Sequence, residues 1–250
     1  MNTSQLKKET KFRKNIMLML LFLILFFSCL IFVFALPSGP SVSYVVNSSR
    51  QSLSTNRSVD VKGTITTLDL DLSQQVYSWK AYVGNVTGAL VLDDVNSKSI
   101  YDWSVSIAGE VYATRSSSVS WSNVSCVNQS VVSSEQVALG ISSSSSYNIN
   151  NTFNSTVHRN FLVGTKNISN STCKSVATYV NDAAQSVSEN SDFQEVLLRD
   201  DLGSFLIYTA LINNDKTGYD GSSTFDFQMI VAENESATVP STYYFYVELG

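Results

Sequence analysis

The segment FLIYTALI, residues 205–212, is the clearest indicator of the fold, because apolar, β-branched and aromatic residues fill it almost completely. Similar runs lie at residues 193–198, 225–232 and 242–249. Polar segments at 213–218 and 233–235 separate three of these runs, and short apolar runs with turn signals between them are typical of antiparallel sheets. No βαβ repeat of about 30 residues accompanies them. The sequence therefore predicts an all-β, antiparallel β-sandwich-like domain.

The β pattern continues toward the N-terminus. Residues 68–72, LDLDL, alternate between apolar and acidic side chains, as in a half-buried strand. Further strands are expected at 76–83, 86–93, 100–107, 110–115 and 119–124. Gly84 and Asn85 favour a turn that joins the first two of these strands in a hairpin, and Ala108 and Gly109 do the same for the next two.

The middle of the chain is less regular. Ser133 or Ser134 is a candidate N-cap for a short helix at 135–139. Residues 142–146 are a run of serines, which indicates a low-complexity loop. Residues 173–180 are compatible with either a helix or a strand.

The longest uncharged run is IMLMLLFLILFFSCLIFVFAL, residues 16–36. A helix of about 20 apolar residues crosses the ~30 Å hydrocarbon core of a bilayer. Basic residues precede this run and are absent after it until Arg50, an asymmetry that predicts a single-pass membrane protein with its N-terminus inside the cell. A secretory signal peptide is the alternative, with Val33-Phe34-Ala35 as a cleavage site and a secreted product.

These features divide the chain into four parts. They are a basic cytoplasmic leader (1–15), a transmembrane helix or signal peptide (16–36), a polar tether (37–57) and an extracellular β-rich domain (58–250). The whole chain has a formal net charge of −5 although its leader is basic, so the exterior part is acidic. An acidic exterior argues against nucleic acids and anionic membrane surfaces as partners.

Two of the three cysteines, Cys126 and Cys173, lie in the exterior domain, whereas Cys29 lies in the hydrophobic run. An even pair of cysteines in an oxidising compartment predicts a disulfide. Two buried free thiols are the alternative. Closing a loop of this length would stabilise the domain by roughly 4 kcal/mol in the chain-entropy model.

The Asn-x-Ser/Thr sequon recurs throughout the exterior domain and is densest between residues 123 and 170. The acceptor asparagines are Asn47, Asn56, Asn85, Asn123, Asn128, Asn150, Asn154, Asn167, Asn170 and Asn234. This frequency exceeds what we expect from a chain that is merely rich in Ser and Asn. It predicts N-glycosylation, provided that the domain crosses a membrane into a compartment with the required machinery.

One loop is a weak candidate for a calcium site. Side-chain oxygens at alternate positions and a glycine for a sharp turn are the features that a calcium loop requires. Here Asn213, Asp215, Thr217 and Asp220 supply the oxygens, but no Glu closes the loop. An ordinary polar hairpin is the more economical interpretation, and no other metal or cofactor is expected.

No catalytic residue is predicted. His158 is the only histidine, so a catalytic triad would have to use it, yet no Gly-x-Ser-x-Gly elbow is present and a solvated loop histidine is expected. Paired carboxylates for glycoside hydrolysis are available but their spacing does not select two of them. These carboxylates are Asp93, Asp94, Asp102, Glu110, Asp200, Asp201 and Asp226.

Aromatic residues are abundant in the strand regions. They have two interpretations, a sugar-stacking platform and a sandwich core, and the core is the commoner role of such residues. The residues concerned are Trp79, Tyr82, Trp103, Trp121, Tyr243, Tyr244 and Tyr246.

Several blocks of sequence resemble those of an uncharacterised group of archaeal secreted or membrane-anchored surface proteins. The blocks are ALPSGP (35–40), WKAYVGNVTG (79–88), LDD (92–94), YDW (101–103), FQEVL (193–197), DFQMIV (226–231) and YYFYVEL (243–249). The resemblance implies a cell-surface protein with Cys126 paired to Cys173, and it brings no catalytic residue with it. The sequence thus predicts an envelope glycoprotein with a structural or adhesive role, in contact with the membrane and with envelope proteins or glycans. A secreted carbohydrate-binding module and a glycan-cleaving enzyme are the alternatives.

Overall fold

The computed structural model describes residues 58–60, 63–76, 78–93, 99–104, 108–234 and 241–249. The leader, the hydrophobic run at 16–36, the tether and the sequons at Asn47 and Asn56 lie outside the described residues. Within the described ranges, the helices are too short or too polar to cross a membrane.

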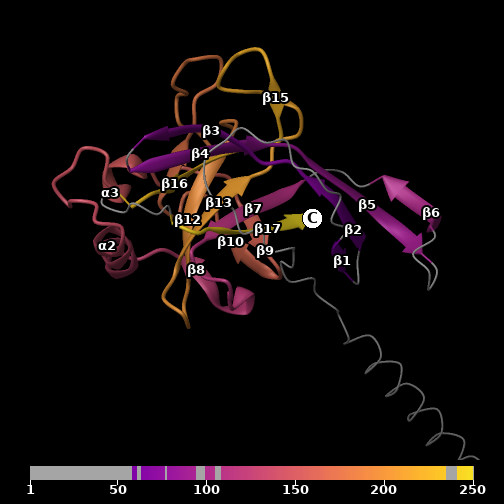
Figure 1. The fold of residues 1–250 in the computed structure, drawn as a ribbon, viewed down its shortest axis with the longest axis horizontal. Coiled ribbons are helices and arrows are strands. Elements are labelled where there is room, and N and C mark those ends of the chain that lie inside the picture. Colours follow the sequence, from indigo (N-terminus) through magenta and orange to yellow (C-terminus); the bar gives the residue numbers. More distant parts are fainter. Residues whose placement is uncertain are drawn as a thin grey trace, which may run out of the picture. The chain divides into compact units, whose positions relative to one another are not determined.

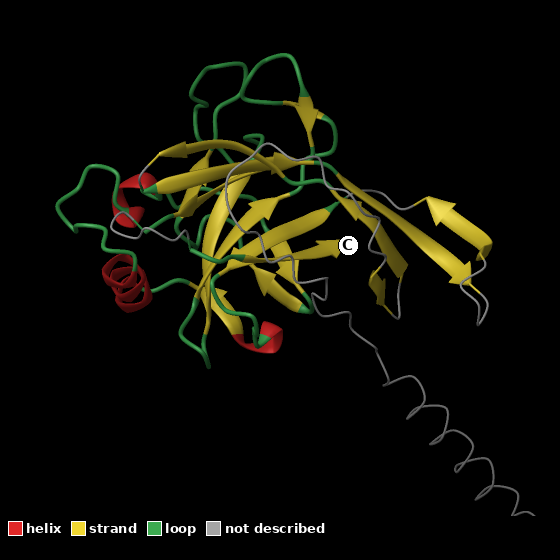
Figure 2. Cartoon of the chain, in the orientation of Figure 1, coloured by secondary structure: helices red, strands yellow, loops and turns green. Residues whose placement is uncertain are grey.

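The largest sheet has six strands, and every pairing in it is antiparallel (Figures 1 and 2). The order is β11-β12-β13-β7-β17, and β8 pairs with β12. The bounds are β7 (Gly109–Thr114), β8 (Val124–Cys126), β11 (Ser175–Ala177), β12 (Gln194–Asp200), β13 (Leu206–Leu211) and β17 (Tyr244–Leu249). The expectation of an all-β, antiparallel fold is confirmed.

The central strands of this sheet are buried on both faces. Every residue of β13 is buried. Tyr208 and Ala210 belong to one apolar cluster, and their neighbours Ile207 and Leu211 belong to a second. Successive side chains of a strand point to opposite faces, so a sheet that is covered on both faces requires continuous apolar runs rather than alternation. This explains why residues 205–212 are the clearest strand in the sequence.

A three-stranded sheet and two helices contribute to the first cluster. The sheet order is β16-β4-β3, with bounds β3 (Asp71–Val76), β4 (Trp79–Gly84) and β16 (Phe227–Ala232). The helices are α2 (Gln129–Ala138) and α3 (Ile149–Thr152). Tyr82 of β4 meets Phe245 of β17 edge to face at 5.0 Å between ring centroids, a favourable aromatic arrangement. The small sheet therefore shares its core with the large one.

A hairpin and a disulfide cover the opposite face of the large sheet. The hairpin pairs β9 (Phe161–Val163) with β10 (Lys166–Ile168), and the 3-10 helix η1 (Trp121–Asn123) lies before β8. Trp121 packs against Tyr112 and Tyr246 in the second cluster. Cys126 is bonded to Cys173, which confirms the predicted disulfide. The bridge connects β8 to the segment that leads into β11.

The predicted hairpin at Gly84 and Asn85 is wrong. β4 pairs with β3 and β16, whereas β5 (Val86–Asp93) pairs with β2 (Gly63–Leu68) and β6 (Ser99–Ser104). The chain passes from one sheet to another at Asn85, whose carbonyl oxygen accepts a hydrogen bond from the amide of Asp69. The expected strand at 68–72 is also interrupted at residues 69–70, beside this crossing. In a four-stranded sheet β1 (Ser58–Asp60) pairs with β2, so the order is β1-β2-β5-β6.

Three further expectations need correction. The strands at 100–107 and 110–115 form no hairpin, because β6 pairs with β5 while β7 lies between β13 and β17. The edge strand at 119–124 is instead η1 followed by β8. The short helix begins earlier than predicted, at Gln129, because Asn128 rather than a serine accepts the capping bond from the amide of Val131 at 2.9 Å.

Candidate functional site

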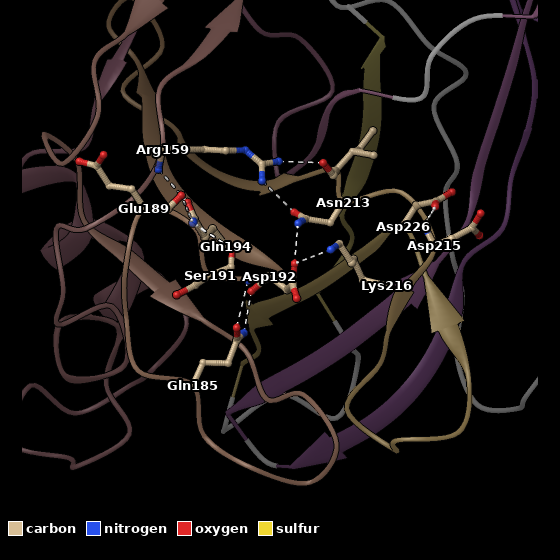
Figure 3. Close-up of polar contacts among 11 residues, drawn as sticks. Arg159, Gln185, Glu189, Ser191, Asp192, Gln194, Asn213, Asp215, Lys216 and Asp226 are labelled. Atoms are coloured by element: carbon tan, nitrogen blue, oxygen red, sulfur yellow. Dashed lines mark hydrogen bonds and ion pairs between the residues drawn. The ribbon is translucent and has the colours of Figure 1, made fainter.

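A set of connected polar side chains lies where the loop before β12 meets the loop after β13 (Figure 3). Arg159 precedes β9, Gln194 begins β12, and Asn213 follows β13. Lys216 lies in the short hairpin of β14 (Lys216–Thr217) and β15 (Thr224–Phe225). The ends of the strands thus bring together groups that are far apart in the sequence.

The Arg159 side chain is the centre of this network. Its guanidinium donates to Asn213 Oδ1 at 3.0 Å and to the carbonyl oxygen of Ile212 at 2.7 Å. Asn213 in turn donates from Nδ2 to Asp192 Oδ1 at 3.0 Å, and Lys216 Nζ lies 3.5 Å from the same oxygen. The series runs from the cationic Arg159 through the amide of Asn213 to the anionic Asp192, which also lies near the cationic Lys216. Each charged side chain therefore has a polar or an oppositely charged partner.

Two glutamines fasten the loop between β11 and β12. The buried Gln194 donates from Nε2 to the carbonyl oxygens of Ser188, Glu189 and Ser191 at 2.9–3.1 Å, and its Oε1 accepts from the amide of Arg159 at 2.8 Å. Gln185 exchanges hydrogen bonds with the backbone of Asp192. These contacts position loops. Together the two glutamines hold the loop between β11 and β12 in place.

Of the carboxylates considered for glycoside hydrolysis, Asp200 and Asp226 are buried and accept from backbone amides, whereas the exposed Asp201 is ion-paired with Arg199 at 2.7 Å. Asp226 accepts from the amides of Val86 at 2.7 Å and Asp215 at 2.9 Å. Asp200 likewise accepts from Ser120 and Leu202, each at 2.9 Å. The side chains of Asp93, Asp94 and Asp102 lie outside the described residues.

Glu110 and Glu248 form a cross-strand carboxyl pair that the sequence did not reveal. They face each other in the register of β7 with β17. Burial and the charge of Glu248 raise the pKa of Glu110 to about 8, although Arg159 acts in the opposite direction. Burial also raises the pKa of Glu248, which accepts from Tyr112 Oη and from the amide of Gly164, both at 2.8 Å.

His158 is not a solvated loop histidine, and that expectation is wrong. Its side chain is fully buried. Nδ1 contacts the carbonyl oxygen of Arg159 at 2.7 Å, and Nε2 accepts from the amides of Thr172 at 3.2 Å and Cys173 at 3.0 Å. This pattern requires the neutral ring with its proton on Nδ1, because a proton on Nε2 would face two donors. Burial accordingly lowers the pKa of His158. The histidine holds the backbone beside the disulfide.

The structure places the four candidate calcium ligands in different hydrogen-bond environments. Asn213 belongs to the Arg159 network, and Thr217 is exposed in β14. Both oxygens of the Asp220 carboxylate accept from Ser222 and Ser223. Among the residues that the structure describes, no group of three or more His, Cys, Asp or Glu is arranged to hold a metal ion.

The sequon asparagines within the described ranges lie at the surface. Exposed ones are Asn85, Asn128, Asn154, Asn167 and Asn170. Partly buried ones are Asn123, Asn150 and Asn234. A glycan attached to Nδ2 needs this access to solvent.

The aromatic residues considered for a sugar platform mostly belong to the core. Tyr82, Trp121 and Tyr243 are buried, and Tyr246 is nearly so. Trp79 packs against Phe153 and donates from Nε1 to the carbonyl oxygen of Tyr147 at 2.8 Å. The side chain of Trp103 lies outside the described residues. Large exposed aromatic side chains are instead those of Tyr101 in β6 and of Tyr147, Tyr179, Phe205 and Tyr219 in the loops.

Comparisons of the chain with protein families, with curated proteins and with solved structures give no match.

Proposed function

We propose that this chain is a cell-surface glycoprotein, anchored by the helix at 16–36, whose β-sandwich-like exterior domain has a structural or adhesive role. The observation that carries the proposal is the surface position of the sequon asparagines in the described residues. They come from strands, turns and helix caps alike, yet none of those described is buried. Each described sequon asparagine is therefore at least partly exposed, as the attachment of a glycan requires.

The covalent and polar cross-links of the domain also support a role outside the cell. The disulfide between Cys126 and Cys173 persists in oxidising compartments and is rare in the reducing cytosol. Lys80 and Glu233 form an ion pair in which both side chains are almost fully buried. The disulfide and the buried ion pair restrict the motion of the domain. A rigid domain is suited to a structural role or to the display of glycans.

Glycopeptide mass spectrometry of the protein from its own membranes tests the proposal. We expect sugar on the exposed Asn154 and Asn167 and lower occupancy at Asn150, which is partly buried. Asn148 is a matched control, because it lies in the same segment but is buried and has no sequon. Protease treatment of intact cells should remove the exterior domain and leave the N-terminal peptide. A full-length chain without sugar, or one protected from external protease, would refute the proposal.

A further inference from the structure

Two loops meet beyond the ends of the sheets, and we name them the tip loops: residues 178–184, after β11, and residues 217–225, which carry the turn between β14 and β15. They rise side by side from the same end of the domain (Figure 1). The amide of Asn181 donates to the carbonyl oxygen of Gly218 at 2.9 Å, and that of Asp182 donates to Tyr219 at 2.6 Å. The two loops are therefore one unit although about 40 residues separate them in the sequence.

The tip loops present aromatic rings at the surface. Tyr179 is 54% exposed and Tyr219 is 40% exposed. The ring of Tyr219 stacks on Phe225 with 6.2 Å between centroids and 9° between planes. The buried Gln228 of β16 lies beneath both tyrosines, since its Nε2 donates to the carbonyl oxygen of Tyr179 at 2.9 Å and its Oε1 accepts from the amide of Tyr219 at 2.8 Å. A single side chain thus connects the backbones of the two tyrosines.

The backbone of the tip loops contains two tight turns. Val180 pairs with Ala183 in an antiparallel bridge, so Asn181 and Asp182, with φ of 49° and 55°, are the central residues of a two-residue hairpin turn. Asparagine and aspartate commonly adopt positive φ in such a turn. Gly221 has φ of 68°, and a Cβ atom there would lie 2.0 Å from Asn181 Oδ1. The aromatic rings are consequently presented by a prearranged support.

Hydroxyl groups and carboxylates accompany the tyrosines in the sequence of the tip loops. Ser222 and Ser223 donate through Oγ to Asp220 Oδ2, and their amides donate to Oδ1. These four bonds use the acceptor capacity of the Asp220 carboxylate and lower its pKa, so Asp220 is ionised. Each serine oxygen keeps lone pairs for a further donor, and donation to a carboxylate strengthens it as an acceptor. The exposed Asp182 supplies another acceptor.

From this arrangement we propose that the tip loops form a binding site for a neutral saccharide. The apolar face of a sugar ring would lie against Tyr179 or Tyr219, as aromatic rings favour such flat contacts. The sugar hydroxyls would donate to Ser222, Ser223 and Asp182. The negative charge of Asp182 and Asp220 disfavours uronic and other anionic sugars. Such a site would give the domain its adhesive role. That role rests on the proposed function, because it requires the domain to lie outside the cell, whereas saccharide binding itself does not.

The size of the aromatic surface favours a sugar over a protein partner. A tyrosine contributes about 150–250 Å² when fully buried, so the exposed parts of the two tyrosines offer about 200 Å² together. A stable protein interface buries about 800 Å² on each partner. Apart from the two tyrosines, Phe225, Val180, Ala183 and Ala184, the residues of the tip loops are polar or glycine, a composition that suits one or two sugar units.

Saccharide binding by the full chain in lipid nanodiscs tests the inference, with no sugar-based detergent present. The probes are maltohexaose, mannohexaose and cellohexaose, with hexagalacturonate as the anionic control, followed by calorimetry and saturation-transfer NMR. We expect at least one neutral probe to bind. Tyr179→Ala and Tyr219→Ala should each weaken its binding about three- to tenfold. Tyr147→Ala is the matched control, since this tyrosine is similarly exposed at 49% but lies before α3, and it should leave binding unchanged.

The outcomes are decisive in either direction. The inference is overturned if no neutral probe binds, if hexagalacturonate binds better, if a protein binds the tip and no sugar does, or if the tip variants bind as the wild type does. Near-UV circular dichroism checks folding. If loss of the Tyr219–Phe225 stack unfolds the domain, Tyr179→Ala decides the result. A glycosylated chain that binds no sugar overturns only this inference, and an unglycosylated chain that binds overturns only the proposed function.

Discussion

Replacing Glu110 with glutamine should stabilise the domain at neutral pH. Glu110 is 6% exposed and faces Glu248 across β7 and β17. Its folded-state pKa is about 8, whereas the ordinary value is 4.5. The folded state therefore retains a proton that the unfolded state releases. Because the folded state binds more protons, stability is full below about pH 4.5 and is lost as the pH rises toward 8.

The size of the effect follows from this difference in pKa. Each unit corresponds to about 1.4 kcal/mol, so at pH 7 the penalty for Glu110 is about 3 kcal/mol, and above pH 8 it approaches about 5 kcal/mol. Glutamine has nearly the same shape and does not titrate. Relative to the wild type, Glu110→Gln should thus gain about 3 kcal/mol between pH 4 and pH 7.

Urea denaturation of the full chain in nanodiscs measures this gain. The experiment compares the wild type and Glu110→Gln at pH 4, 5.5, 7 and 8.5. The fluorescence of Trp121 reports on this region, because its ring packs against Tyr112 and Tyr246. These tyrosines lie in β7 and β17, the strands that carry Glu110 and Glu248. The two proteins should differ least at pH 4. A difference that is the same at every pH, or a variant that is less stable at pH 7, would refute the reasoning.

Three further predictions concern other interactions that stabilise the domain. Cys126→Ser should lower the free energy of unfolding by about 4 kcal/mol, because the bridge closes a loop with a sequence separation of 47; equal melting with and without reductant would contradict this. Gln194→Met should cost about 2–4 kcal/mol by leaving buried backbone groups without partners, and limited proteolysis should then cut the 186–191 loop faster; unchanged cleavage would count against it. The lowered pKa of His158 means that the folded state resists protonation, so stability should fall as the pH drops below about 6.5. Comparison with His158→Gln isolates this effect, and a constant difference between pH 7 and pH 4 would show that the histidine does not titrate as inferred.

The strands that coincide with long apolar runs were predictable, and their partners were not. β12, β13 and β17 of the large sheet and β16 of the three-stranded sheet agree with the apolar runs found in the sequence. The error at Gly84 and Asn85 shows the limit, because good turn residues lie at a crossing between sheets. The local preference of these residues for a turn is outweighed by tertiary contacts. One of them is the hydrogen bond from the amide of Val86 to Asp226, which is 140 residues away in the sequence.

The site residues divide in the same way. The cysteine pair and the sequons followed from spacing and composition. The burial of His158 could not be predicted, because most of the residues around it in the sequence are polar. The backbone amides of Thr172 and Cys173 that donate to its ring come from a segment about 15 residues away. Tyr179 and Tyr219 were overlooked since neither lies in a strand, and only the pairing of the tip loops brings them together.

The amino-acid sequence by itself determined that the domain is built of antiparallel strands and that Cys126 has a partner in Cys173, because strand periodicity and cysteine number are local or compositional properties. The tertiary structure decided which strands are neighbours, that Glu110 faces Glu248, and which aromatic residues reach the surface. These depend on contacts between distant segments, where the gain from burying apolar faces outweighs local preference. A residue's pKa, its exposure and its possible ligands are consequences of those contacts.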